Sequence, residues 1–132
     1  METLQPPGWP RPKGYANGIM AEGQMIFVAG QIGWDKTGKL VSDDLVGQFR
    51  KTLENTLAVL AEGGAGPEHI VRMTWYITSR EDYLGKLKEI GDAYRALMGA
   101  HYPVMAMVEV SALMEEGALV EVETTAVVPA NA

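Results

Sequence analysis

The stretch 102–110 constrains the fold of this chain more than any other segment, because it reads Tyr-Pro-Val-Met-Ala-Met-Val-Glu-Val. Proline has no amide hydrogen to donate, so Pro103 is suited to the first residue of a strand. The valines and the alanine then alternate with Met105, Met107 and Glu109, which is the period of two that a strand requires. We expect the valine face to point to the core. The methionine face is then expected to be covered by another subunit, by a ligand, or by both, because apolar side chains seldom face solvent.

The composition limits the class of protein. A length of 132 residues, with 47% hydrophobic and 21% charged residues, is typical of one globular domain with a hydrophobic core. The chain has no cysteine and only two histidines, so we expect no disulfide, no zinc site and no cofactor. A net charge of -6 argues against a nucleic-acid partner. No apolar run approaches the ~20 residues that span a membrane. No signal peptide is recognised either, so the cytoplasm is the expected location.

The chain is predicted to divide into an arm and one domain. The arm, residues 1–14, is rich in proline and is expected to be extended, with Trp9 as its anchor. The domain covers residues 15–132. Its first part is expected to be two strands joined by a turn at Gly23, the second of them buried on both faces. A glycine inside that second strand, Gly30, indicates a bulge or a close approach by another group.

The remaining elements follow from periodicity and capping signals. A helix is predicted to begin at Ser42 as its N-cap, and a second helix is predicted between the capping box at Ser79 and Gly99. Strands at 69–78, 103–110 and 119–128 complete the order ββαβαββ. This order predicts an α+β sandwich, in which a mostly antiparallel sheet carries two helices on one face.

Several motifs in this order resemble the RidA/YjgF family, also called the endoribonuclease L-PSP or translation-inhibitor-like family. The motifs are Gly-Tyr-Ala-Asn-Gly at 14–18, Ala-Gly-Gln-Ile at 29–32, a helix with Thr52, Asn55 and Leu60, and Tyr94 to Val110 followed by Val-Glu-Val-Glu at 120–123. The resemblance covers about residues 14–128. It implies a chorismate-mutase-like fold assembled as a homotrimer, with the sheets inside and a small-molecule cleft between neighbouring subunits.

The resemblance also implies an activity, the hydrolysis of reactive enamines and imines such as 2-aminoacrylate to a keto acid and ammonia. Tyr15, Gly30 and the adjacent Gln31 match positions that line the family's cleft. Glu121 matches the glutamate that positions the attacking water, and it is therefore the candidate catalytic residue. The alternative for Glu121 is a structural role in a hydrogen-bond network between subunits.

Three positions depart from the family pattern. Met105 stands where the resemblance implies an arginine that grips the substrate carboxylate, Met107 replaces a cysteine, and Gly91 replaces an asparagine. Loss of such a charged pair costs about 2–5 kcal/mol. We therefore expect an apolar cleft suited to a longer aliphatic or aromatic ligand, and poor activity on 2-aminoacrylate. Arg72 is a candidate for the missing cation or for an ion pair between subunits. Trp34 either roofs the cleft or packs on its own subunit.

Three functions remain open from the sequence. The first is a hydrolase or deaminase of enamine or imine type with an unidentified substrate. The second is a trimer that binds a metabolite, or acts as a chaperone, without catalysis. The third is an endoribonuclease, which an acidic chain without an obvious acid–base histidine pair supports least. Lys13 and Arg11 of the arm are weaker candidates for a cation at the cleft.

Overall fold

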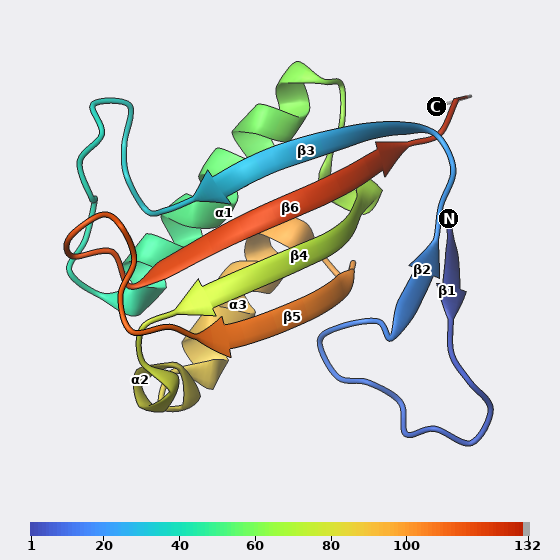
Figure 1. The fold of residues 1–132 in the computed structure, drawn as a ribbon, viewed down its shortest axis with the longest axis horizontal. Coiled ribbons are helices and arrows are strands. Elements are labelled where there is room, and N and C mark those ends of the chain that lie inside the picture. Colours follow the sequence, from blue (N-terminus) through green and yellow to red (C-terminus); the bar gives the residue numbers. More distant parts are fainter. Residues whose placement is uncertain (131–132) are drawn as a thin grey trace.

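One mixed sheet, with helices on one of its faces, makes up the domain (Figure 1). The computed structural model of the chain describes residues 1–130. The strands lie in the order β3 (Gln24–Gln31), β6 (Val120–Val128), β4 (Ile70–Ile77) and β5 (Val104–Glu109). The first two pairs are antiparallel, and β4 with β5 is parallel. The predicted α+β sandwich is therefore confirmed.

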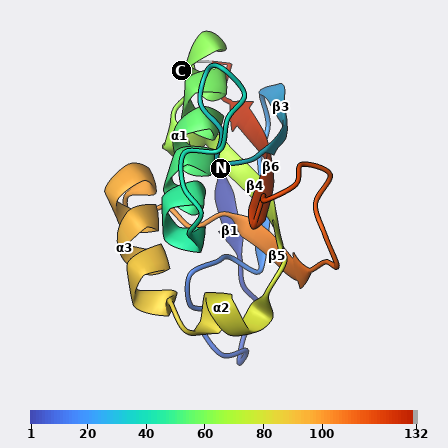
Figure 2. The same cartoon turned by 90° about the vertical axis from the view of Figure 1, so that its left-hand side faces the viewer.

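Two long helices cover the same face of the sheet, as the side view shows: α1 (Leu45–Glu62) and α3 (Leu87–Met98) (Figure 2). The N-cap of α1 is Asp44, whose carboxylate accepts hydrogen bonds from two backbone N–H groups of the first turn. The predicted cap, Ser42, lies two residues earlier, where its hydroxyl accepts from the N–H of Asp44. No helix in residues 1–130 is long and apolar enough to cross a membrane.

The second predicted helix is divided in two. The first piece, α2 (Arg80–Leu84), begins at Ser79, whose side chain accepts from the N–H of Asp82 as the capping box predicted. It ends at Gly85, and α3 begins after Lys86. A short 3-10 helix, Pro67–His69, precedes β4.

The N-terminal arm forms a small sheet beside the main one (Figure 1). In it, β1 (Glu2–Leu4) pairs antiparallel with β2 (Gly18–Met20). The two strands predicted on either side of the turn at Gly23 are both present, but they belong to different sheets, because the arm supplies the partner of β2. Trp9 is 59% exposed, so the anchor expected of it is not formed within this chain.

The core lies between the sheet and the helices. The inward faces of β4 and β6 carry Met73, Trp75 and Val122, which are buried. The predicted faces of β5 are reversed. Met105 and Met107 stand opposite Met73 and Trp75 in the parallel pairing, so they share the helix-facing side of the sheet and pack against the core.

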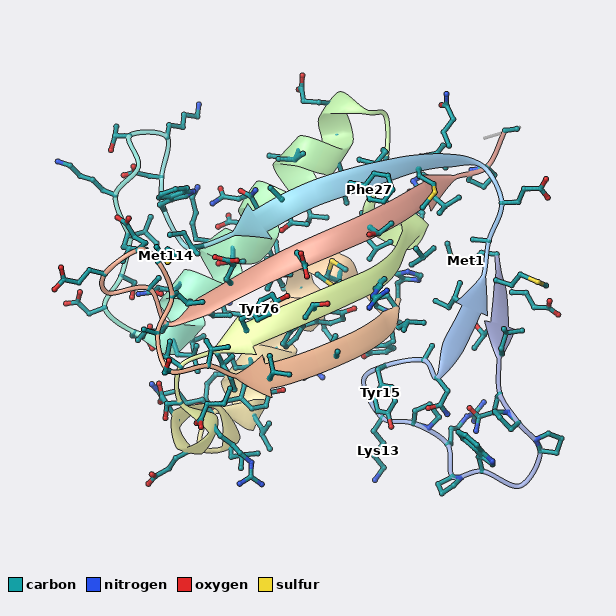
Figure 3. The ribbon with its side chains drawn as sticks, in the orientation of Figure 1. Met1, Lys13, Tyr15, Phe27, Tyr76 and Met114 are labelled. Carbon is teal, nitrogen blue, oxygen red and sulfur yellow. The ribbon has the colours of Figure 1, made fainter. Side chains whose placement is uncertain are left out.

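The other face of the sheet is open in the single chain and carries large apolar side chains. Val108 is 44% exposed, Met25 57% and Phe27 71%. The prediction that β3 is buried on both faces is thus wrong for one chain, in which only its Val28 side is covered. Figure 3 shows Phe27 and Tyr76 on this open face, on the side of the sheet away from the helices.

Candidate functional site

A cavity of about 440 Å³ lies between β5 and α3 on the helix side of the sheet. Three of the predicted site residues, Tyr15, Met105 and Met107, line it together. Its volume is within the range of small-molecule binding sites in proteins. Met105 and Met107 line this cavity because their face of β5 points toward the helices.

The loop that carries Tyr15 is fixed to the beginning of β5. The N–H of Ala16 donates to the carbonyl of Pro103 at 3.0 Å, and Ala16 forms an isolated bridge with Val104. Figure 3 shows Lys13 and Tyr15 on the loop between β1 and β2, beside this end of β5. The carbonyl of Pro103 therefore holds the arm at the cavity.

Aromatic side chains form one wall of the cavity. The ring centroids of Tyr94 and Tyr102 are 5.5 Å apart in a stacked pair, and those of Trp75 and Tyr94 are 6.1 Å apart. The Tyr94 hydroxyl donates to the carbonyl of His101. Burial raises the pKa of the Tyr94 hydroxyl, and burial also raises that of Tyr83 in the same cavity. Both phenols therefore stay neutral at physiological pH, and the wall is uncharged.

Two cationic side chains line the same cavity, Lys13 from the arm and Arg95 from α3. Arg95 lies one helical turn after Gly91, and a Cβ atom at Gly91 would stand 3.1 Å from a guanidinium nitrogen. Lys13 is a candidate cation predicted from the sequence, whereas Arg95 is not among the predicted residues. No local sequence signal marks Arg95, because its place at the cavity depends on how α3 packs on β5.

Glu121 and Gly30 form a second group, on the other side of the sheet. β3 has a bulge between Val28 and Gln31, and the Glu121 side chain of β6 lies against Gly30 there. A Cβ atom on Gly30 would stand 2.7 Å from the carboxylate carbon of Glu121. The predicted close approach at Gly30 is confirmed. Gln31 turns its side-chain amide back to the carbonyl of Ala29 at 3.0 Å.

These two groups lie apart within one chain. Gly30 and Gln31 are on the edge strand β3, whereas Met105 and Met107 are on β5 at the opposite edge. Glu121, on β6, lines a different part of the sheet from the cavity. One chain therefore does not bring the candidate catalytic carboxylate to the candidate binding cavity.

Arg72 and Trp34 do not line the cavity at Met105 either. Arg72 lies on the open face of the sheet, in a hollow that it shares with Phe27 and Glu123. It therefore does not replace the missing arginine within its own chain. Trp34 lies in the loop after β3, where its carbonyl accepts from the side chain of Asn55 at 2.9 Å.

Comparison with known proteins gives the family. A family model described as endoribonuclease L-PSP matches residues 10–128. A RutC family protein of Pyrococcus abyssi is 36% identical over 118 residues, or 89% of each chain. A putative reactive intermediate deaminase, TdcF of Escherichia coli K12, is 32% identical over 131 residues, covering 96% of this chain and 95% of TdcF. The chain belongs to the endoribonuclease L-PSP family, also called the RidA/YjgF family.

The solved structures agree with this assignment. YyfB of Yersinia pestis, a protein of unknown function in the conserved Rid family, superimposes with a TM-score of 0.83 at 27% identity. The alignment covers 96% of this chain and 98% of that chain. The fold expected from the family resemblance is therefore the fold that the chain adopts.

Proposed function

We propose that three copies of this chain form a ring whose intersubunit clefts hydrolyse imines or enamines that carry an apolar group. The observation that carries this proposal is the division of the candidate site between opposite edges of one sheet. A chain with half a site at each edge gains a complete site when the β5 edge of one copy meets the β3–β6 side of the next. Such a head-to-tail contact closes into a ring when the rotation between copies fits.

The open face of the sheet supports the same assembly. Phe27 and Met25 on β3 and Val108 on β5 are more than two-fifths exposed in a single chain, with exposed fractions of 71%, 57% and 44%. Large apolar side chains that share one face are typical of contact surfaces. The helices cover only the other face, so the sheets are the surfaces left to meet inside the ring.

The proposed reaction uses Glu121 as a base. Its carboxylate accepts a proton from a water molecule while the water oxygen attacks the imine carbon. The proton then passes to the nitrogen, which gives a carbinolamine. Glu121 takes the proton of the carbinolamine hydroxyl and returns it to the amine nitrogen as the carbon–nitrogen bond breaks, so the products are a carbonyl compound and ammonia. Tyr15 and the backbone beside Gly30 orient the substrate. A related chain, TdcF, is named a putative reactive intermediate deaminase, which supports this class of reaction.

The apolar lining favours a larger substrate than 2-aminoacrylate. At the position where the family resemblance implies an arginine, Met105 offers no charge to a carboxylate. Methionine side chains adapt to irregular apolar and aromatic surfaces. A substrate with an aliphatic or aromatic group therefore fills the cavity better than a small imino acid does.

Imines generated in situ from phenylalanine, leucine and serine provide the test, because they differ in the size of the group that enters the cavity. We expect faster decay of the first two, and loss of that acceleration in Glu121→Gln. Met105→Arg should shift the preference toward the small imine. Equal, background decay of all three imines with the unmodified protein would contradict the proposal.

A second function, metabolite binding without catalysis, is favoured by one specific observation. Within the described chain, the cavity at Met105 has no carboxylate and no histidine in its lining, so its own walls supply no general base. If aromatic ligands bind to the cavity while no imine is consumed, this second function replaces the first. The imine assay and a titration with an aromatic ligand, both made on one preparation of the protein, distinguish the two functions.

A further inference from the structure

The two cations at the cavity define what kind of molecule enters it. We infer that the cavity binds an amphipathic anion, with its carboxylate at Arg95 and Lys13 and its aromatic or branched aliphatic body on Met105 and Met107. This inference rests on the proposed small-molecule site, and it deepens that proposal by naming the ligand class. It places the anion on α3 and the arm, not on β5.

The charges around the cavity support an anionic group. Arg95 and Lys13 both line it, and no acidic side chain from residues 1–130 does so. The whole chain has a net charge of -6, so a local pair of cations is an exception to its surface. Arg95 donates to the carboxylate of Asp92 at 2.7 Å, but Asp92 is shared with Lys88 at 3.1 Å. This group of three therefore keeps a net positive charge.

The depth of the cavity separates the two ends of the ligand. Arg95 and Lys13 are exposed, whereas Trp75 and Ile90 in the same lining are buried, with exposed fractions of 4% and 3%. The cations thus stand at the mouth, and the apolar side chains form the floor. A guanidinium can grip a carboxylate with two parallel hydrogen bonds at such a mouth.

Gly91 gives Arg95 its position. A Cβ atom at Gly91 would stand 3.1 and 3.3 Å from the two terminal guanidinium nitrogens. The absent side chain therefore leaves the surface of α3 over which Arg95 extends. Gly91, Met105 and Met107, the three positions that depart from the pattern implied by the family resemblance, all line this one cavity.

Titration calorimetry with 4-phenylbutyrate and its uncharged isostere 4-phenylbutyramide tests this inference. The carboxylate should bind about tenfold more tightly than the amide, as one charge-assisted hydrogen bond at a partly exposed site allows. Arg95→Gln should reduce this ratio to about twofold or less, and Arg95→Lys should retain part of it. Acetate, which has the charge but no body, should bind weakly.

Lys88→Gln is the matched control. It also removes a partner of Asp92 from α3, but Lys88 does not line the cavity, so the ratio of carboxylate to amide affinity should fall less than it does in Arg95→Gln. Equal binding of carboxylate and amide would overturn the anion anchor and leave the cavity as a ligand site. Equal losses in Arg95→Gln and Lys88→Gln would also overturn it. Failure of both probes to bind would overturn the proposed site together with the anchor.

Discussion

Gly30 is the residue where the absence of a side chain has the clearest functional meaning. Its backbone has no positive φ, so no conformational need explains a glycine there. The need is for space, because the carboxylate of Glu121 occupies the position that a side chain would take. The glycine therefore keeps the candidate catalytic group against the bulge of β3.

Gly30→Ala should displace Glu121 with little loss of stability. The group in the way is the end of a flexible side chain, which can rotate, so we expect the free energy of unfolding to change by less than about 1 kcal/mol. Imine hydrolysis should fall as far as it does in Glu121→Gln. Urea unfolding and the imine assay on the same preparation check both statements.

Gly33→Ala is the contrasting control. A Cβ atom there would stand 2.6 Å from the Cα of Gln48, which is backbone of α1 and has no rotation available. The expected loss of stability is about 1–3 kcal/mol. If Gly30→Ala destabilises the protein as much as Gly33→Ala while activity per folded molecule is unchanged, the role assigned to Gly30 is wrong.

The strands differ in how clearly the sequence predicts which of their two faces is buried. The alternation in β6 predicts its inward face correctly because the outward residues are polar. In β5 both faces are apolar, so the period of two reveals two faces without deciding which is buried. The choice is made by the parallel register with β4, which places Met105 beside Met73. That register is a tertiary property that no local pattern contains.

The same reasoning explains the other differences. The apolar character of Phe27 on β3 predicts a core residue, but Phe27 lies exposed on the open face of the sheet, which we propose as a contact surface. The pairing of β1 with β2 joins residues 2–4 to 18–20 across a proline-rich loop, which short-range turn signals do not predict. At the candidate site, Tyr15, Met105 and Met107 were found through the family resemblance, whereas Arg95 needed the three-dimensional packing of α3 on β5.

The cap of α1 is an element whose stability depends on pH. The N–H of Gly47 donates to the Asp44 carboxylate and, with weaker help from Val46, holds the pKa of that carboxyl below its usual value of 3.8. Because the pKa of the Asp44 carboxyl is lower in the folded chain, the cap stabilises the folded state fully at pH values above the pKa of the unfolded chain. The stabilisation is lost as the pH falls through the folded value.

Asp44→Ala should lower the free energy of unfolding by about 1 kcal/mol at neutral pH. The difference from the unmodified protein should shrink once the pH falls below 3.8, the usual carboxyl pKa. Urea unfolding at one fixed protein concentration measures it. Asp43→Ala removes a neighbouring exposed acid that makes no cap bond and should change little. A difference that stays constant down to acidic pH would contradict the cap assignment.

At the scale of the whole molecule, the proposed function depends on the proposed assembly of three chains. Phe27→Asp places a charge on the open face of the sheet, and an unpaired charge buried in a contact is strongly unfavourable. We expect sedimentation velocity to show three chains of 14.3 kDa for the unmodified protein and mainly single chains for Phe27→Asp.

Val59→Asp is the control for that comparison, because Val59 is 41% exposed on α1, on the outer side of the proposed ring. It should sediment like the unmodified protein. If Phe27→Asp keeps the trimer while Val59→Asp dissociates it, the helices and not the sheets form the contact.

The claim that one site is built from two chains can be tested most directly by mixing two defective subunits. Glu121→Gln keeps the cavity and loses the carboxylate, whereas Gly91→Trp fills the cavity and keeps the carboxylate. Random co-assembly in a ring joins an intact cavity to an intact Glu121 at about one quarter of the interfaces. We expect imine hydrolysis by the co-expressed pair to recover to about one quarter of the unmodified rate. Activity no higher than the average of the two separate variants would contradict a site shared between subunits.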